Sequence, residues 1–284
     1  MRLMKLASFL VCAMLALCCF VLLRASDEML IVEQQYDLLE LNGRDGVNAK
    51  NIKQILYVTP DAVCIDEYGD GGPTPTETYV LDLKDQRIIN LDHAAKAILV
   101  NETFAERRAR ILKKKAEVQQ DINALEPGKQ RKKIEDMYRF MLDDKRQYKT
   151  VDDSGKKDVA GVSCKVLKIV DANDPTFVAV EAALHPDIEM PYDNSEVLFL
   201  LKIVGEKVSQ YLKENKAVFS HVPMELHLTT PDGAKLDTKV LSVKKIKTAE
   251  FDAKSRPLGD PFKLPEYKAK PKAGSVAPEK GKAD

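Results

Sequence analysis

The sequence predicts an α+β fold in which an antiparallel β-sheet packs against amphipathic helices. Three observations support this prediction. Short runs with apolar residues at alternate positions recur between polar turns, as expected for strands. A stripe of apolar residues spaced by seven then interrupts the strands, which indicates a helix. A second amphipathic stretch precedes the last two strands.

The first strands are expected as a meander within residues 50–101. Polar turns such as Thr59-Pro60-Asp61 and Lys84-Asp85-Gln86 separate the runs, and turns this short favour antiparallel neighbours. The expected strands are Ile52–Val58, Ala62–Tyr68, Thr78–Leu83, Arg87–Leu91 and Lys96–Asn101.

A helical hairpin is expected over residues 103–145. Its first helix carries the stripe Phe104, Ile111, Val118 and Leu125, and Pro127-Gly128 ends it. The second helix has one apolar face, formed by Ile134, Met137, Tyr138, Met141 and Leu142.

Strands resume after the hairpin, and one long helix divides them. We expect strands at residues 147–151, 162–170, 176–184, 222–230 and 235–248. The helix is expected at 195–213, with Asp193 and Glu196 as a capping box and with Leu201 and Val204 buried. In the strand near the end, Met224, Leu226 and Leu228 alternate with polar residues, which indicates one buried face.

The apolar run Leu6–Leu23, between Lys5 and Arg24, predicts export from the cytoplasm. Residues 1–25 are read as a signal peptide cleaved after Ala25 or as an uncleaved signal anchor. The protein is then periplasmic or attached to the outer face of the cytoplasmic membrane. One domain is expected over residues 26–267, followed by a disordered tail over 268–284 rich in Lys, Ala, Pro and Gly.

Composition excludes several classes of function. The 44 basic and 44 acidic residues balance, so the basic footprint of a nucleic-acid-binding protein is absent. None of the four histidines has the spacing of zinc ligands, and no cofactor motif or catalytic constellation occurs. We therefore expect a protein that is not an enzyme and has no cofactor.

Two features of the expected domain each allow two interpretations. Cys64 and Cys164 could form a disulfide in an exported protein, or they could be half-buried thiols on strands. Ten basic residues lie between Arg107 and Lys133, opposed by three acids. This basic hairpin could touch anionic lipid headgroups, or it could be a solvated helix face.

The order of several short motifs resembles the DUF4412 family of exported bacterial proteins, which looks related to the lipoprotein-carrier (LolA/LolB-like) superfamily. The resemblance covers residues 50–267 and rests on TYVLDL at 78–83, RIINLD at 87–92, VAGVSCKV at 159–166, HVPMEL at 221–226, TKVLSVKKI at 238–246 and PFKLPEY at 261–267. It implies an antiparallel sheet curled into an incomplete barrel, with helices on its concave side. The helical hairpin 103–145 is then an insertion.

The resemblance also implies a ligand, because relatives in the wider superfamily hold acyl chains on the concave side of the sheet. The residues expected to line an apolar pocket are Val63, Ile65, Tyr79, Leu81, Met224, Leu226 and Leu228, which occupy alternating strand positions. The expected function is an exported envelope protein that binds a lipid or another apolar ligand. The alternative is a structural or interaction module of the envelope in which the helices fill the sheet.

Overall fold

A single sheet of twelve strands organises the protein, in the order β12-β6-β5-β4-β3-β2-β1-β11-β10-β9-β8-β7. The structure is a computed structural model that describes residues 27–39, 49–69, 72–138, 146–201, 204–229 and 235–269. The strands are β1 Glu28–Leu39, β2 Ala49–Val58, β3 Ala62–Tyr68, β4 Glu77–Asp82, β5 Arg87–Asp92, β6 Ala97–Thr103, β7 Tyr148–Val159, β8 Val162–Asp171, β9 Val178–Glu189, β10 His221–Thr229, β11 Lys235–Lys247 and β12 Lys268–Ala269. The helices are α2 Phe104–Asn123, α3 Lys129–Tyr138, α4 Asn194–Leu200 and α5 Glu206–Glu214.

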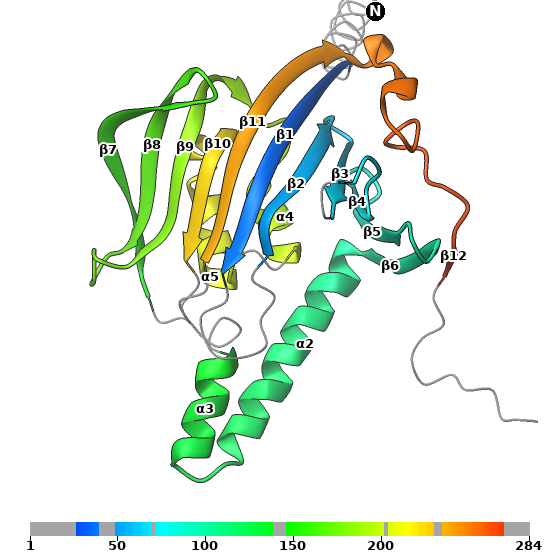
Figure 1. Ribbon diagram of the computed structural model, residues 1–284. Coiled ribbons are helices and arrows are strands. Elements are labelled where there is room, and N and C mark those ends of the chain that lie inside the picture. Colours follow the sequence, from blue (N-terminus) through cyan, green and yellow to red (C-terminus); the bar gives the residue numbers. More distant parts are fainter. Residues whose placement is uncertain are drawn as a thin grey trace, which may run out of the picture.

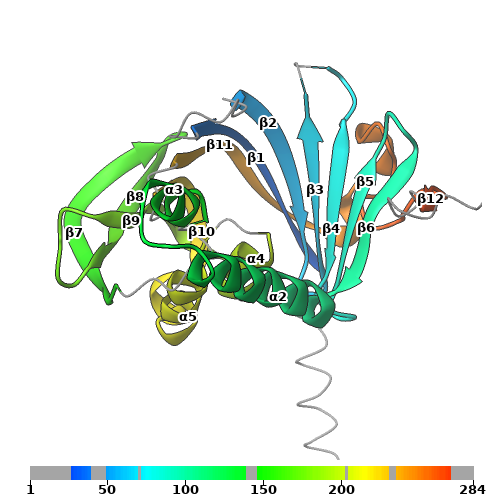
Figure 2. The ribbon, with the colours of Figure 1, turned by 90° about the horizontal axis from the view of Figure 1, so that it is seen from below.

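The sheet is curled but not closed, with β12 and β7 at its two edges. All neighbouring strands are antiparallel except the short pair of β12 with β6. Seen from below, the two arms of the sheet curve toward each other, and α2, α4 and α5 lie on the concave side (Figure 2). The predicted curled antiparallel sheet is therefore confirmed.

The register of the strands explains how the sheet buries both of its faces. Leu30, Val58, Val63, Leu81 and Ile88 are successive cross-strand partners on one face and pack with α4. This face is called the inner face. The alternate residues point to the outer face, because side chains on a strand alternate between faces. They form a second apolar cluster with the C-terminal segment 248–267: Met29, Tyr57, Cys64, Val80, Ile89 and Leu91.

The central strand β1 was not predicted from the sequence. It lies between β2 and β11, so it joins the two halves of the sheet (Figure 1). Because both faces of β1 are covered, its first residues, Met29 to Val32, form a continuous apolar run in place of an alternating one. Polar residues follow this run, so the rest of the strand shows no apolar alternation by which it could be recognised in the sequence.

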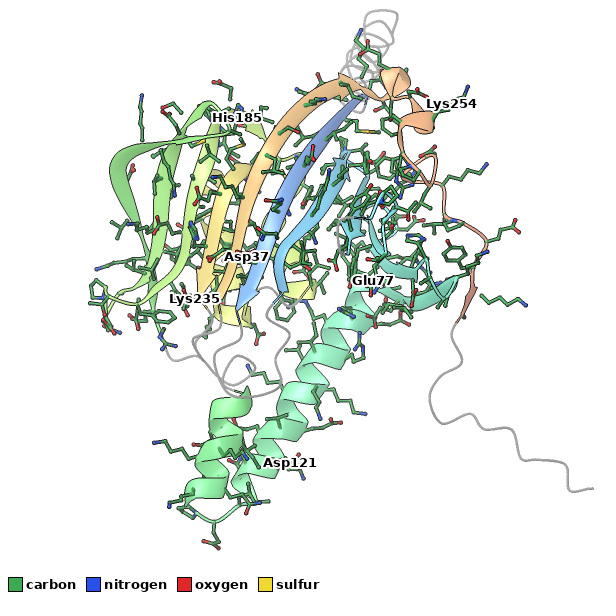
Figure 3. All side chains as sticks on the ribbon, viewed as in Figure 1. Asp37, Glu77, Asp121, His185, Lys235 and Lys254 are labelled. Atoms are coloured by element: carbon green, nitrogen blue, oxygen red, sulfur yellow. The ribbon has the colours of Figure 1, made fainter. Side chains whose placement is uncertain are left out.

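Helices α2 and α3 follow each other between β6 and β7, where two helices were expected. Thr103 and Glu106 form a capping box at the start of α2 that the sequence analysis missed. Phe104 and Ile111 pack against the inner face, whereas Asp121 lies on the part of α2 that extends away from the sheet (Figure 3). The expected residues 139–145 of the second helix lie outside the described residues, and its role as an insertion in a family stays a prediction.

The expected helix over 195–213 is wrong, because two short helices occupy this region. Gly205 adopts extended backbone angles (φ −73°, ψ 166°) at the start of α5, and a glycine weakens a helix that runs through it. The expected capping box is also wrong. Asp193 accepts hydrogen bonds from the backbone N–H and the hydroxyl of Ser195, and Glu196 binds elsewhere. Leu201 and Val204 are half-buried at the helix break.

The structure describes only a small part of the two terminal segments for which the sequence made predictions. Lys268 and Ala269, the first residues of the expected tail, form β12 beside β6, and residues 270–284 lie outside the described residues. The apolar run Leu6–Leu23 lies outside them as well. Among the helices that the structure describes, none has the length and apolar character needed to cross a membrane.

Truncation of Leu200 is expected to destabilise the fold more than truncation of its neighbour Leu201. Leu200 is fully buried in the cluster between α4 and the sheet, so Leu200→Ala should lower the free energy of unfolding by about 2–5 kcal/mol. Leu201 is half-buried, and Leu201→Ala should cost about 1–2 kcal/mol. Urea denaturation followed by circular dichroism measures both. Equal costs would mean that α4 is not seated as described.

Candidate functional site

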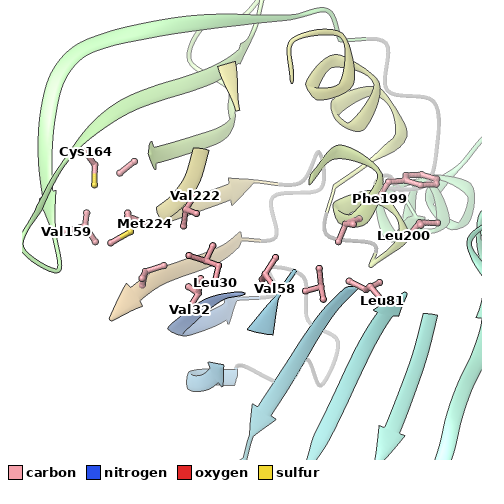
Figure 4. Packing of buried hydrophobic residues seen from close by; sticks show 14 of the residues in the cluster. Leu30, Val32, Val58, Leu81, Val159, Cys164, Phe199, Leu200, Val222 and Met224 are labelled. Atoms are coloured by element: carbon pink, nitrogen blue, oxygen red, sulfur yellow. The ribbon is translucent and has the colours of Figure 1, made fainter. Parts of the chain in front are cut away.

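The seven residues expected to line a pocket are divided between two parts of the inner face. Val63, Ile65, Leu81 and Met224 belong to the cluster that packs against α4 (Figure 4). Leu226 and Leu228 belong to a neighbouring cluster under α5, with Val208 and Leu212 of that helix. Tyr79 lies beside the first group, where its hydroxyl is hydrogen-bonded to Glu77. The inner face is thus continuous and apolar across most of the sheet.

Helix α4 occupies the space in front of the first group. Its residues Val197, Phe199 and Leu200 are 5%, 4% and 0% exposed. Val63 and Leu81 beneath them are both 0% exposed, so in this conformation the helix fills the middle of the curled sheet. Seven residues form this helix, a length that has little stability without its tertiary contacts.

Polar contacts with α2 hold the outward side of α4. Arg108 donates to both carboxylate oxygens of Glu196, at 3.3 and 2.5 Å, and its guanidinium lies over the Phe199 ring at 4.7 Å. Arg107 donates from Nε to the carbonyl oxygen of Leu200 at 3.0 Å, satisfying a helix-end acceptor. We call Arg107, Arg108 and Glu196 the α2–α4 latch.

Most basic residues in the stretch from Arg107 to Lys133 form ion pairs with acidic residues of the same chain. Seven of its ten basic residues form ion pairs: Arg107, Arg108, Arg110, Lys113, Lys114, Lys115 and Arg131. Arg107 and Arg110 both bind Glu102, which lowers the pKa of that carboxyl despite its partial burial. Contact of this stretch with anionic headgroups stays a prediction.

Beyond the apolar rows, the inner face carries a row of polar side chains. Gln34, Gln54, Glu67 and Glu77 are successive partners on β1, β2, β3 and β4. Gln34 donates to Gln54 at 2.9 Å, and Gln54 donates to Glu67 at 3.1 Å. We call these four residues the polar row.

Two tyrosines and an asparagine donate hydrogen bonds to the glutamates of the polar row. Tyr36 donates its hydroxyl to Glu67 Oε2 at 3.0 Å, and Tyr79 donates to Glu77 Oε2 at 3.0 Å. Burial, and then the charge of the neighbouring glutamate, raise the pKa of each tyrosine well above its usual value, so both hydroxyls keep their protons. Asn90, which is 7% exposed, donates from Nδ2 to Glu77 Oε2 at 3.2 Å.

A buried ion pair fixes the C-terminal segment on the outer face. Arg256 donates to both oxygens of Asp66, at 2.6 and 2.7 Å, and the two side chains are 4% and 0% exposed. Its Nη1 donates to the carbonyl oxygens of Gly259 and Asp260, and its guanidinium lies 5.6 Å from the Tyr57 ring centre. The guanidinium therefore has a counter-charge and further hydrogen-bond acceptors, as a buried charge requires.

A chain of hydrogen bonds extends from this ion pair to the edge of the sheet. Thr78 donates its hydroxyl to Asp66 at 2.6 Å, and its oxygen is 2.7 Å from His93 Nε2. Since the only hydroxyl proton of Thr78 goes to Asp66, His93 must donate from Nε2. His93 Nδ1 then accepts from the Tyr267 hydroxyl at 3.0 Å. Burial lowers the pKa of His93, which suits this neutral tautomer.

Of the two interpretations of the cysteines, the structure has the free thiols: Cys64 and Cys164 form no disulfide, and both are buried. Cys64 is on β3 and Cys164 is on β8, and five strands separate these two in the sheet. At about 4.8 Å per strand, the two thiols are too far apart to bond. Burial, followed by the charge of Asp66, raises the pKa of the Cys64 thiol, so it is an unreactive thiol.

Two carboxylates bracket His227 on β10. Its Nδ1 is 2.8 Å from Asp237, and its Nε2 is 2.8 Å from Glu225, which also binds Lys157. Burial lowers the pKa of His227, but the hydrogen bonds to Asp237 and Glu225 outweigh burial and raise it overall. Glu225 and His227 are two apart on β10, a spacing that could have indicated this contact.

Comparisons with known proteins leave the family open. No family model matches the chain, and no curated protein matches it. Two solved structures of PNGF-II align with 80% of this chain at 10% and 11% identity, with TM-scores of 0.34 and 0.32. The chain spans 29% and 30% of their length. A DUF1329 family protein from Desulfovibrio piger aligns at 8% identity over 80% of this chain and 88% of that one, with a TM-score of 0.16. TM-scores this low carry no conclusion about fold or function.

Removing Arg256 is expected to destabilise the protein strongly. Arg256→Met leaves the Asp66 carboxylate buried without a counter-charge and should lower the free energy of unfolding by about 3–5 kcal/mol. The double variant Asp66→Leu, Arg256→Met removes both charges and should recover most of this loss. Denaturant titration measures the three proteins. A single variant as stable as the parent would contradict the anchoring role of this ion pair.

His227 is expected to make stability depend on pH near neutrality. Its raised pKa means that its contribution is fully present below its unfolded pKa of about 6.5 and is lost as pH rises through the folded pKa. The difference in melting temperature between the parent and His227→Gln should therefore shrink between about pH 6 and pH 8. His185→Gln is the control, because burial lowers the pKa of His185 and its pH dependence has the opposite sign.

Proposed function

We propose that this chain is an exported protein of the cell envelope that binds a lipid or another apolar ligand on the inner face of its sheet. In this proposal, the ligand chain takes the place of α4 against Val63, Leu81 and Met224. The observation that carries the proposal is the α2–α4 latch. It attaches a short helix over the apolar centre of the sheet through one half-exposed ion pair, which is weak and reversible, and one hydrogen bond to the end of the helix.

Three further features support the proposal. The apolar inner face continues from the cluster under α4 to the cluster under α5, which is longer than one short helix needs. The break at Gly205 leaves α4 as a helix of only seven residues, so the element that covers the centre of the sheet is short. The resemblance to DUF4412 and to the lipoprotein-carrier superfamily, with the hairpin 103–145 as an insertion, is part of the same proposal.

Location and membrane partners follow from the N-terminal sequence. Leu6–Leu23 would carry the chain out of the cytoplasm and leave it in the periplasm or on the outer face of the cytoplasmic membrane. Arg107–Lys133 would then lie near the membrane, where Lys129, Lys132 and Lys133 are exposed and could contact anionic headgroups. No catalytic role is proposed for any residue.

The second candidate is a structural or interaction module of the envelope that holds no ligand. The complete burial of Leu200 and of Val63 beneath it favours this function, because a filled core needs no further occupant. The two candidates differ in whether α4 can be displaced. Native mass spectrometry of protein purified from its host envelope detects a retained lipid directly.

Weakening the latch is expected to strengthen ligand binding. Glu196→Gln removes the charge from a half-exposed ion pair, a loss of about 0.5–1 kcal/mol that favours the displaced position of α4. The affinity for the neutral fluorescent probe N-phenyl-1-naphthylamine should then rise about two- to fivefold. Fluorescence titration measures this affinity.

Glu117→Gln is the matched control, because Glu117 pairs with Lys113 and Lys114 on the exposed side of α2. Its affinity for the probe should equal that of the parent protein. If neither the parent nor Glu196→Gln binds the probe, and no lipid is retained on purification, the structural module is the function.

A further inference from the structure

The polar row places two carboxylates of like charge side by side. Glu67 and Glu77 are direct partners on the antiparallel strands β3 and β4, so their side chains start about 5 Å apart. Both are half-buried on the half of the sheet formed by β3 to β6, where Figure 3 labels Glu77. Within the described residues, neither glutamate forms an ion pair with a lysine or arginine. Like charges that face each other across strands are destabilising, so this arrangement has a cost in the free protein.

The existing hydrogen bonds use only one oxygen of each glutamate. Gln54 and Tyr36 both donate to Glu67 Oε2, and Tyr79 and Asn90 both donate to Glu77 Oε2. In the described part of the chain, Oε1 of each glutamate accepts no hydrogen bond. Two negatively charged acceptors are therefore held in place by four donors while one oxygen of each stays available.

Asn90 supplies a third acceptor at the same place. Its side-chain oxygen Oδ1 is buried and has no hydrogen-bond partner among the described residues. The amide nitrogen of the same group donates to Glu77, so the amide lies against the Glu77 carboxylate. Asn90 is 7% exposed, and a buried acceptor without a partner costs about 1–3 kcal/mol. Such a group in a native fold calls for a ligand or water that donates to it.

The apolar residues next to these acceptors indicate what else the ligand contains. Val32, Leu56, Ile65 and Val100 lie in the adjoining row of the inner face, on the strands β1, β2, β3 and β6. Leu56, Ile65 and Val100 are partly buried against the cluster under α4. A ligand that touches both rows must have an apolar body and a head that donates hydrogen bonds.

We propose that Glu67, Glu77 and Asn90 bind the primary ammonium head of an amphiphile whose apolar chain lies along the inner face. A primary ammonium has three N–H donors and one positive charge, matching three free oxygens and uncompensated negative charge. The inference rests on the proposed function, because it names the head group of the ligand proposed to displace α4. Free fatty acids are poor ligands under this proposal, since their carboxylate would face Glu67 and Glu77.

A divalent cation is the competing occupant of such a carboxylate pair. In the part of the chain that the structure describes, no group of three or more His, Cys, Asp or Glu side chains could hold a metal ion. Asp92, the next residue along the row, accepts a hydrogen bond from the Ala95 backbone in a turn. The donor set therefore favours an ammonium head, and the metal becomes an outcome of the test.

Isothermal titration calorimetry at neutral pH, below the micellar concentrations, tests the proposal with four ligands that share a twelve-carbon chain and differ in the head group. Dodecylamine should bind about tenfold more tightly than dodecanol, and dodecanoate should bind more weakly than both. Dodecyltrimethylammonium carries the same charge without N–H donors, and it should lose most of the advantage of dodecylamine. These comparisons use the parent protein, so they do not depend on the folding of a variant.

Variants then assign the preference to the named residues. Glu67→Gln and Glu77→Gln should each reduce the dodecylamine preference about tenfold while leaving dodecanol binding unchanged. Glu33→Gln is the control, because Glu33 precedes Gln34 on β1 but points to the outer face, where it pairs with Lys53 at 2.6 Å. It should keep the full preference.

Each contrary result has a distinct meaning. Equal binding of dodecylamine and dodecanol overturns the ammonium site and leaves the apolar-ligand function standing. Binding of none of the four ligands overturns both proposals. Calcium binding that is lost in Glu67→Gln, together with no amine preference, overturns the ammonium site in favour of a metal site.

Discussion

An open sheet of twelve strands must cover its apolar inner face and the apolar part of its outer face on β1 to β6, and the rest of this structure follows from that constraint. A closed barrel would bury its inner side chains against one another, but here β7 and β12 remain edges. Helices α2, α4 and α5 cover the inner face, and the segment 248–267 covers the outer face of β1 to β6. The two covers are held differently. The polar contact of α4 is a half-exposed ion pair added to its apolar packing, whereas a fully buried ion pair holds the C-terminal segment.

The sequence predicts the strands well where short polar turns separate apolar runs. β3 was expected with the bounds that the structure has, and β4 to β6 differ from expectation by one or two residues. β1 was missed because its apolar run, Met29 to Val32, is short and polar residues form most of the rest of the strand. The break between α4 and α5 was missed because the apolar period continues across Gly205. Local propensity ended the helix there, whereas periodicity alone predicted its continuation.

The residues expected to line a pocket lie on the inner face, and their role in binding a ligand stays a prediction; the polar row beside them was missed. Six of the seven expected residues belong to the clusters under α4 and α5, and Tyr79 binds Glu77. The polar row was missed because Gln54, Glu67 and Glu77 read as solvent-facing positions, although they lie on the same face as Val63 and Leu81. Asp66 stands beside Glu67 in its strand, and its partner Arg256 is 190 residues away. No local pattern can connect residues so distant in the chain.

The distance between Asp66 and Arg256 also bears on how the chain acquires its fold during synthesis. The first strand, β1, pairs with β11 near the other end of the sequence, and Arg256 follows β11. A ribosome that has produced only β1 to β10 has made a sheet without its central pairing and an aspartate without its counter-charge. Contacts of such long range form slowly. Any chain terminated before residue 256 keeps an exposed apolar outer face, which makes truncated products substrates for proteolysis.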